Sequence, residues 1–98
     1  MTAPITLDLF APLLHQHFEL ETEGLAVRLE LIEAAPLKHA LPSKLGRQPF
    51  FLLFRGPTQL LLPQQTFSVN HGAIGAHQIF IVPVGPDSIG PRYEAIFN

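Results

Sequence analysis

Two histidine pairs are the residues of this chain whose type and spacing could do chemistry. His15 and His17 would point to the same side of an extended chain, a spacing that can supply two metal ligands. No nearby carboxylate or histidine supplies a third and a fourth ligand, so we interpret both as surface residues. His71 and His77 flank a glycine-containing turn, and an enzyme that uses both is one hypothesis. We expect hydrogen-bonded turn residues instead, and no metal site.

None of the other reactive side chains stands in a catalytic pattern. Ser43, Ser68 and Ser88 lack the Gly-x-Ser-x-Gly setting of a nucleophile elbow. The glutamates between residues 19 and 33 alternate with apolar residues, as the solvated face of a sheet requires. The chain has no cysteine, and its glycines form no phosphate-binding loop. We therefore predict a non-enzymatic protein without a cofactor.

Arg55 ends the most apolar stretch of the chain. A buried charge is costly unless it is paired, so this guanidinium needs either a carboxylate or solvent. Glu94 is a plausible partner, and a side chain that reaches solvent from the strand end is the alternative. We interpret the pair as structural rather than as a site.

The length and composition of the chain limit the classes of protein to which it can belong. The chain has 98 residues, which predicts one small domain over residues 1–98. Its apolar fraction of 47%, against 14% charged residues, is high for so short a chain, so we expect some apolar surface to meet a partner. A net charge of −2 with scattered basic residues gives no reason to expect nucleic acid or an anionic membrane.

Neither a signal peptide nor a membrane span is apparent. The amino terminus lacks a basic segment followed by an apolar one, and no apolar run approaches the roughly 18 residues of a spanning helix. We predict a soluble protein that is cytoplasmic, or exported as part of an assembly without a cleaved signal.

The elements that would position these residues begin with a short helical segment. Its apolar residues, at 9, 10, 13 and 14, are spaced to point inward, and Thr6 or Asp8 could cap it. Residues 18–22 and 25–33 alternate with period two across a Glu-Gly turn. This pattern predicts a β hairpin.

The second half of the chain predicts further strands after a long loop over residues 34–48. Residues 50–54 are apolar on both faces, which is typical of a central strand, and we expect a second such strand over residues 78–84 to lie near it. The remaining strands are expected at residues 60–62, shortened by Pro63, and at residues 66–70 and 92–98.

Six or seven short strands separated by Gly and Pro turns predict an all-β fold, a small antiparallel sandwich or barrel. The helical segment would plug one end or cover one face. We favour a barrel-like sandwich, because closure protects strand edges from pairing between molecules.

Several strings in the sequence also resemble a known family. They are Pro49-Phe50-Phe51-Leu52-Leu53-Phe54-Arg55-Gly56-Pro57, Leu62-Pro63-Gln64, Ile79-Phe80-Ile81-Val82-Pro83-Val84-Gly85 and Tyr93-Glu94-Ala95-Ile96-Phe97-Asn98. The chain is thereby similar to a family of short bacterial proteins of unknown function. Its members accompany tail-fibre or tail-collar-like proteins, so the resemblance implies a part in a phage-tail-like or filamentous assembly.

We therefore predict a structural or protein-interaction module that binds another protein or a second copy of itself, by sheet augmentation or through an aromatic patch. The alternatives are a barrel that binds a small apolar ligand in an internal cavity and an enzyme that uses His71 and His77. The residues we expect to serve structure or interaction are Phe50, Phe51, Phe54, Arg55, Phe80, Glu94 and Phe97.

Overall fold

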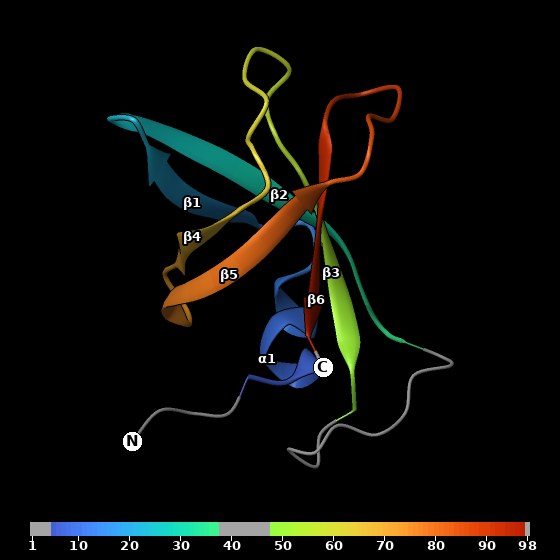
Figure 1. The fold of residues 1–98 in the computed structure, drawn as a ribbon. Coiled ribbons are helices and arrows are strands. Elements are labelled where there is room, and N and C mark those ends of the chain that lie inside the picture. Colours follow the sequence, from blue (N-terminus) through green and yellow to red (C-terminus); the bar gives the residue numbers. More distant parts are fainter. Residues whose placement is uncertain (1–4, 38–47, 98) are drawn as a thin grey trace.

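Six strands close an antiparallel β barrel in the computed structural model, which describes residues 5–37 and 48–97 (Figure 1). Around the barrel the strands follow the order β1-β2-β3-β6-β5-β4, and β4 returns to β1. The predicted all-β fold with a short N-terminal helical segment is confirmed. The strands in chain order are β1 (His17–Thr22), β2 (Leu25–Pro36), β3 (Phe50–Arg55), β4 (Gln65–His71), β5 (Gly75–Pro83) and β6 (Arg92–Phe97).

Two of the six junctions between strands are sparse. β1 and β4 share one residue pair, Glu19 with Asn70, and β5 and β6 share two, at Val82 and Pro83 of β5. The other junctions pair along most of a strand. The sheet β1-β2-β3-β6 therefore meets the β4–β5 hairpin along two narrow seams, which explains why the sequence pattern fits both a sandwich and a barrel.

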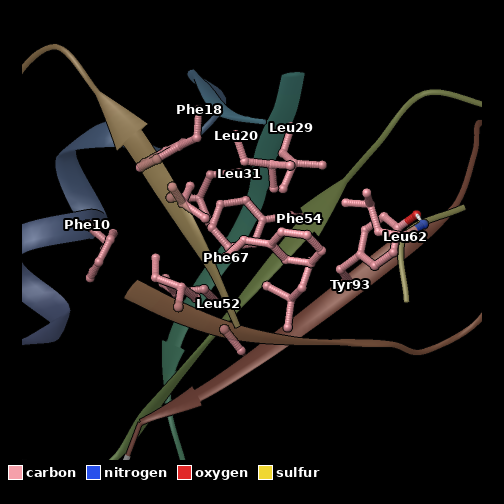
Figure 2. Close-up of a cluster of buried hydrophobic side chains, with 14 of the residues drawn as sticks. Phe10, Phe18, Leu20, Leu29, Leu31, Leu52, Phe54, Leu62, Phe67 and Tyr93 are labelled. Carbon is pink, nitrogen blue, oxygen red and sulfur yellow. Dashed lines mark hydrogen bonds between the residues drawn. The ribbon is translucent and has the colours of Figure 1, made fainter. Parts of the chain in front are cut away.

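Apolar side chains fill the interior of the barrel (Figure 2). Each strand points alternate residues inward, as β3 does with Phe50, Leu52 and Phe54. Among the described residues, no polar or charged residue is buried. Even an eight-stranded barrel is only just wide enough for side chains or one small ligand, so six strands leave the interior to the protein's own residues.

A bulge in β2 accounts for the strand's unexpected length. The pairing with β3 skips Ile32, because Leu31 lies opposite Phe54 and Glu33 opposite Leu53. This extra residue shifts the inward face by one position, so that Ala34 rather than Glu33 packs toward the core. The predicted end of the strand at residue 33 is therefore wrong, and β2 continues to Pro36. The rest of the predicted loop, residues 38–47, lies outside the described residues.

A second correction concerns the strand pair that we expected near the centre. β3 has β2 and β6 as its neighbours, and β6 separates it from β5. The apolar pattern of the two strands predicts burial on both faces, but only one face of each is fully buried. Phe51 and Leu53 on β3 are half-buried, and Phe80 on β5 is 50% exposed. The pattern also does not encode which strands are adjacent.

Two short helices close one end of the barrel, the helix end. The helix α1 (Leu7–Phe10) leads directly into the 3-10 helix η1 (Ala11–Leu13), which contains Pro12. Thr6 occupies the N-cap position, but its side chain makes no capping hydrogen bond. Leu14, which we expected to point inward, is 38% exposed because the helix has ended before it.

Phe10 is the residue that plugs the helix end. It is fully buried, and its ring centroid lies 6.3 Å from that of Phe18, 6.2 Å from that of Phe50 and 5.9 Å from that of Phe97. These rings come from β1, β3 and β6, so one side chain joins three strands to the helix. Figure 1 shows α1 below β5 and close to the end of β6.

The crossover segment, residues 56–64, closes the opposite end. It joins β3 to β4, which lie on opposite sides of the barrel, so it has to pass across the end. Leu62 is buried there, and its N–H donates to the hydroxyl oxygen of Tyr93 at 2.8 Å (Figure 2). The predicted strand at residues 60–62 is wrong, because Leu62 bonds to a side chain instead of a neighbouring strand.

We expect Phe10→Ala to destabilise the protein by about 3–5 kcal/mol, because it empties the centre of the aromatic cluster. Urea unfolding monitored by circular dichroism measures the loss. Leu14→Ala is the matched control, since it shortens a partly exposed side chain next to η1, and it should cost less than about 1 kcal/mol. Equal losses for the two variants would show that Phe10 is not the plug.

Tyr93→Phe should cost about 1–3 kcal/mol, because it leaves the buried N–H of Leu62 without its acceptor while the ring stays in place. The free energy of unfolding gives the cost, and amide hydrogen exchange at Leu62 locates it. Exchange at Leu62 that is as slow as in the wild type would contradict the anchoring role of the hydroxyl.

Candidate functional site

A groove opens at the end of the barrel opposite α1, between the crossover segment and the loop that joins β5 to β6. Both loops rise at the top of Figure 1. We call this region, residues 56–64 and 84–91, the loop end. The groove has a volume of about 450 Å³, and its lining residues are Thr58, Leu61, Pro83, Gly85, Pro86, Gly90, Pro91 and Arg92.

The groove is apolar, and the two loops that form it also carry exposed apolar side chains. Apart from Thr58 and Arg92, its lining consists of Leu, Pro and Gly. Leu61 is 70% exposed, and Ile89 and Val84 on the neighbouring loop are 65% and 39% exposed. A hollow combined with exposed apolar residues is typical of a binding surface rather than of solvated loops.

Asp87 organises the β5–β6 loop from within. Its Oδ1 accepts hydrogen bonds from the backbone N–H groups of Ile89 at 2.9 Å and Gly90 at 3.0 Å, and its own N–H donates to the carbonyl oxygen of Gly90 at 3.1 Å. An aspartate that bonds to its own turn in this way fixes the backbone without help from the surroundings. The wall of the groove is therefore shaped before any ligand binds.

Gly90 lets the two loops pack tightly. A Cβ atom at this position would lie 3.2 Å from the carbonyl oxygen of Gly56 and 3.3 Å from Cγ2 of Thr58. Both distances are shorter than ordinary carbon contacts, so a side chain here would push the loops apart.

Arg55 fastens the β5–β6 loop to the barrel. Its Nε donates to both carboxylate oxygens of Asp87, at 3.3 and 3.1 Å, and its Nη2 also donates to Oδ2. Its Nη1 lies 3.9 Å from Oε1 of Glu30 on β2. The side chains of Arg55 and Asp87 are only 18% and 25% exposed. The cluster therefore joins β2, β3 and the loop.

The hydrogen bonds between Arg55 and Asp87 shift the pKa of both side chains. The bonds from Arg55, followed by those from the amides of Gly90 and Ile89, hold the pKa of Asp87 well below its ordinary range. The same bond to Asp87 raises the pKa of Arg55 despite its burial, with smaller contributions from the charges of Asp87 and Glu30. Arg55 and Asp87 therefore stay ionised at neutral pH.

The predicted partner of Arg55 was wrong. Arg55 pairs with Asp87 and Glu30 instead of Glu94, because the strand register puts Arg92 opposite Arg55 and Glu94 opposite Leu53. One local signal was available, since an Asp three residues before a Gly is typical of a turn that the Asp side chain stabilises. The contact between the loop and Arg55 of β3, which joins segments distant in the sequence, had no such signal.

Arg92 lies on the edge of the groove. Its Nε donates to the carbonyl oxygen of Gly85 at 3.1 Å, which directs the guanidinium toward the β5–β6 loop. Its own carbonyl oxygen accepts the N–H of Val84 at 3.1 Å. The sequence pattern does not mark this residue as a site, because its role depends on how the β5–β6 loop packs against β6.

His71 and His77 hydrogen-bond within and beside the β4–β5 turn, and none of the bonds of the described residues joins one imidazole to the other. Nδ1 of His71 accepts the N–H of Ala73 at 2.9 Å, so its Nε2 carries the proton that bonds to Oε1 of Gln16 at 2.8 Å. Nε2 of His77 donates to the carbonyl oxygen of Ile74 at 2.9 Å. Each imidazole has separate partners, which is the arrangement expected of turn residues.

His15 and His17 are both exposed. His15 has a positive φ of 70°, so the two residues are not in one extended strand, and its Nδ1 lies 3.8 Å from Oε2 of Glu30. Within residues 5–37 and 48–97, no group of three or more His, Asp or Glu side chains is placed to hold a metal ion.

The aromatic residues predicted for structure or interaction separate into two sets. Phe50 and Phe54 are fully buried, and the ring of Phe97 stacks on Phe50 with centroids 4.7 Å apart. Phe51 is half-buried on the outer face of β3, whereas Phe80 on β5 is 50% exposed. Only Phe80 among them presents a largely exposed ring to a partner.

The structure and its apolar end groove define a small closed β barrel with a candidate binding site between two loops. The chain belongs to the family described as a domain of unknown function (DUF6916), whose sequence model matches residues 5–97. The prediction of membership in a family of unknown function is thus confirmed. No curated protein and no solved structure matches the chain. In the described part of the chain, no helix is long and apolar enough to cross a membrane.

We expect Asp87→Asn to lower the melting temperature at pH 7, because it removes the charge that pairs with Arg55 but keeps an acceptor for the loop amides. The folded-state pKa lies below the unfolded value of about 3.9, so the carboxylate stabilises the fold fully above that value and progressively less as the pH falls. The difference in melting temperature between wild type and variant should therefore shrink progressively as the pH falls below about 4.

Differential scanning fluorimetry at pH values from about 7 to about 2.5, a range that includes the ordinary pKa of an aspartate, measures this difference. Glu33→Gln, which changes an exposed carboxylate on β2, controls for the change in net charge. A difference between wild type and Asp87→Asn that persists unchanged at low pH would refute the ion pair as its cause.

Proposed function

We propose that this protein is a non-enzymatic interaction module and that the loop end is its docking surface. The observation that carries the proposal is the apolar groove of about 450 Å³, with Leu61, Ile89 and Val84 exposed on the two loops that form it. Exposed apolar side chains gain free energy when a partner covers them, and a preformed groove loses little conformational entropy on binding.

Two features of the loop end support docking by side chains rather than by an added strand. Most strand edges of the barrel are already paired, and an added strand would have to open one of the two narrow seams. The wall of the groove is fixed by Asp87 and Arg55, so it can present its apolar residues without rearrangement.

The family resemblance of the sequence supports a more specific role for this module, as an accessory of a phage-tail-like or filamentous assembly. A small barrel with one apolar end suits such a role, because it can attach to a larger subunit through that end. The partner is then another protein of the assembly or a second copy of the chain.

A small apolar ligand is the second candidate occupant. The volume of the groove lies within the roughly 300–1,000 Å³ of small-molecule sites. Such a ligand would bind between the loops and not inside the barrel, where the buried side chains of β1 to β6 fill the interior.

The test compares proteins captured from the native host by immobilised wild-type chain and by variants of it, using quantitative mass spectrometry. We expect Leu61→Asp combined with Ile89→Asp to reduce capture of the specific partner at least about tenfold, since about 1.4 kcal/mol of lost binding suffices. Leu25→Asp is the matched control, because Leu25 is 56% exposed on the β1–β2 hairpin.

Phe80→Asp tests the other exposed aromatic surface in the same experiment. Capture that is lost with Phe80→Asp and kept with the Leu61 and Ile89 changes would move the docking surface to β5. If every variant captures the same proteins at the same level, the proposal of an apolar docking surface fails.

A further inference from the structure

From the surroundings of Arg92 we infer that the groove accepts an apolar side chain of a partner protein whose neighbouring Asp or Glu pairs with Arg92. This inference rests on the proposed docking function and names the chemistry of what docks. Two observations support it. The guanidinium of Arg92 has no carboxylate partner among the described residues, and the prolines that line the groove have no N–H to donate.

Arg92 differs from the other described arginines in its lack of a carboxylate partner. Arg28 lies 3.8 Å from Glu19, and Arg55 is held by Asp87 and Glu30. All eight Asp and Glu residues of the chain fall within residues 5–37 and 48–97, and none of them lies within 4 Å of the Arg92 guanidinium there. The groove therefore has a positive charge at its edge that the described part of the chain does not neutralise.

The geometry of Arg92 leaves its outer nitrogens available. Nε is bonded to the carbonyl oxygen of Gly85, which restrains the half-buried side chain, while neither Nη1 nor Nη2 has a hydrogen-bond acceptor among the described residues. A guanidinium held in this way is preorganised for a carboxylate. The apolar walls beside it exclude water and strengthen such a pair relative to one on an open surface.

The walls of the groove favour a side chain over an extended main chain. Pro83, Pro86 and Pro91 have no N–H to donate. The N–H of Val84 already donates to the carbonyl oxygen of Arg92, and that of Gly90 to Asp87. A strand bound along the groove would find no row of donors. An apolar side chain needs none, and Leu61 and the prolines cover it on several sides.

Charge complementarity also selects an acid over a base. Arg92 lies directly opposite Arg55 in the strand register. Arg55 is already paired with Asp87 and Glu30, which leaves Arg92 as the group that a partner carboxylate can reach.

NMR titration of the ¹⁵N-labelled full chain tests the inference with two isosteric probe peptides, Ac-Gly-Leu-Glu-Gly-NH₂ and Ac-Gly-Leu-Gln-Gly-NH₂. We expect the Glu peptide to bind at least about fivefold more tightly and to shift the Nε–H signal of Arg92 and the amide signal of Gly90. Arg92→Gln should abolish the preference, and Arg92→Lys should retain part of it. Arg28→Gln is the matched control and should keep the preference intact.

As a control, the spectrum of each variant should match that of the wild type outside the loop end. Equal affinity for the two peptides, or no shift of either signal up to about 10 mM peptide, overturns the inference. Hexanoate is a third probe. If hexanoate binds in a manner that depends on Arg92 and neither peptide binds, the inference is wrong and the occupant of the groove is a small amphipathic acid.

The capture experiment separates this inference from the proposed function. If Leu61→Asp with Ile89→Asp abolishes partner capture and Arg92→Gln leaves it unchanged, the docking surface stands and the role of Arg92 is wrong. If neither change affects capture, both are wrong. A loss of capture at least about fivefold with Arg92→Gln supports the inference.

Discussion

Closure of a six-stranded barrel along two narrow seams is the constraint on which the rest of this structure depends. One residue pair joins β1 to β4 and two join β5 to β6, so backbone pairing contributes less to closure here than at the other junctions. Buried side chains from all six strands share one core, which adds to closure. Phe10 contacts β1, β3 and β6, and its ring centroid also lies 6.4 Å from that of His77 on β5. Tyr93 ties the crossover segment to β6. The two short helices at one end and the crossover segment at the other are therefore integral parts of the barrel.

This constraint explains why the loop end combines rigidity with an apolar surface. The crossover segment must bury Leu62 to close the barrel, and the turn that does so leaves Leu61 on the outside. The β5–β6 loop packs on this segment through Gly90 and is fastened to β3 by Asp87 and Arg55. The exposed apolar residues are thus a by-product of a fixed backbone, which is a favourable starting point for a binding surface.

Local patterns in the sequence predicted the elements of the fold better than their arrangement. The period-two alternation of β1, the first part of β2, and β4 reports directly which face of each strand is buried, and the N-terminal spacing of apolar residues reports a short helix. The bulge at Ile32 hid the last residues of β2, because one extra residue reverses the alternation. The adjacency of β3 and β6, and the bond from Leu62 to Tyr93, depend on contacts between distant segments. For the same reason the candidate site could not be located, although Arg55 was rightly expected to need a partner.

The way Asp87 holds its loop has a consequence for how this family could diversify. Its carboxylate bonds to an arginine and to backbone N–H groups, so these hydrogen bonds use none of the side chains at positions 88 and 89. Substitutions at these positions would alter the chemistry of the surface while leaving its shape intact. A barrel of this kind could acquire new specificities by exchanging a few residues, as the hypervariable loops of antibodies do on their constant framework.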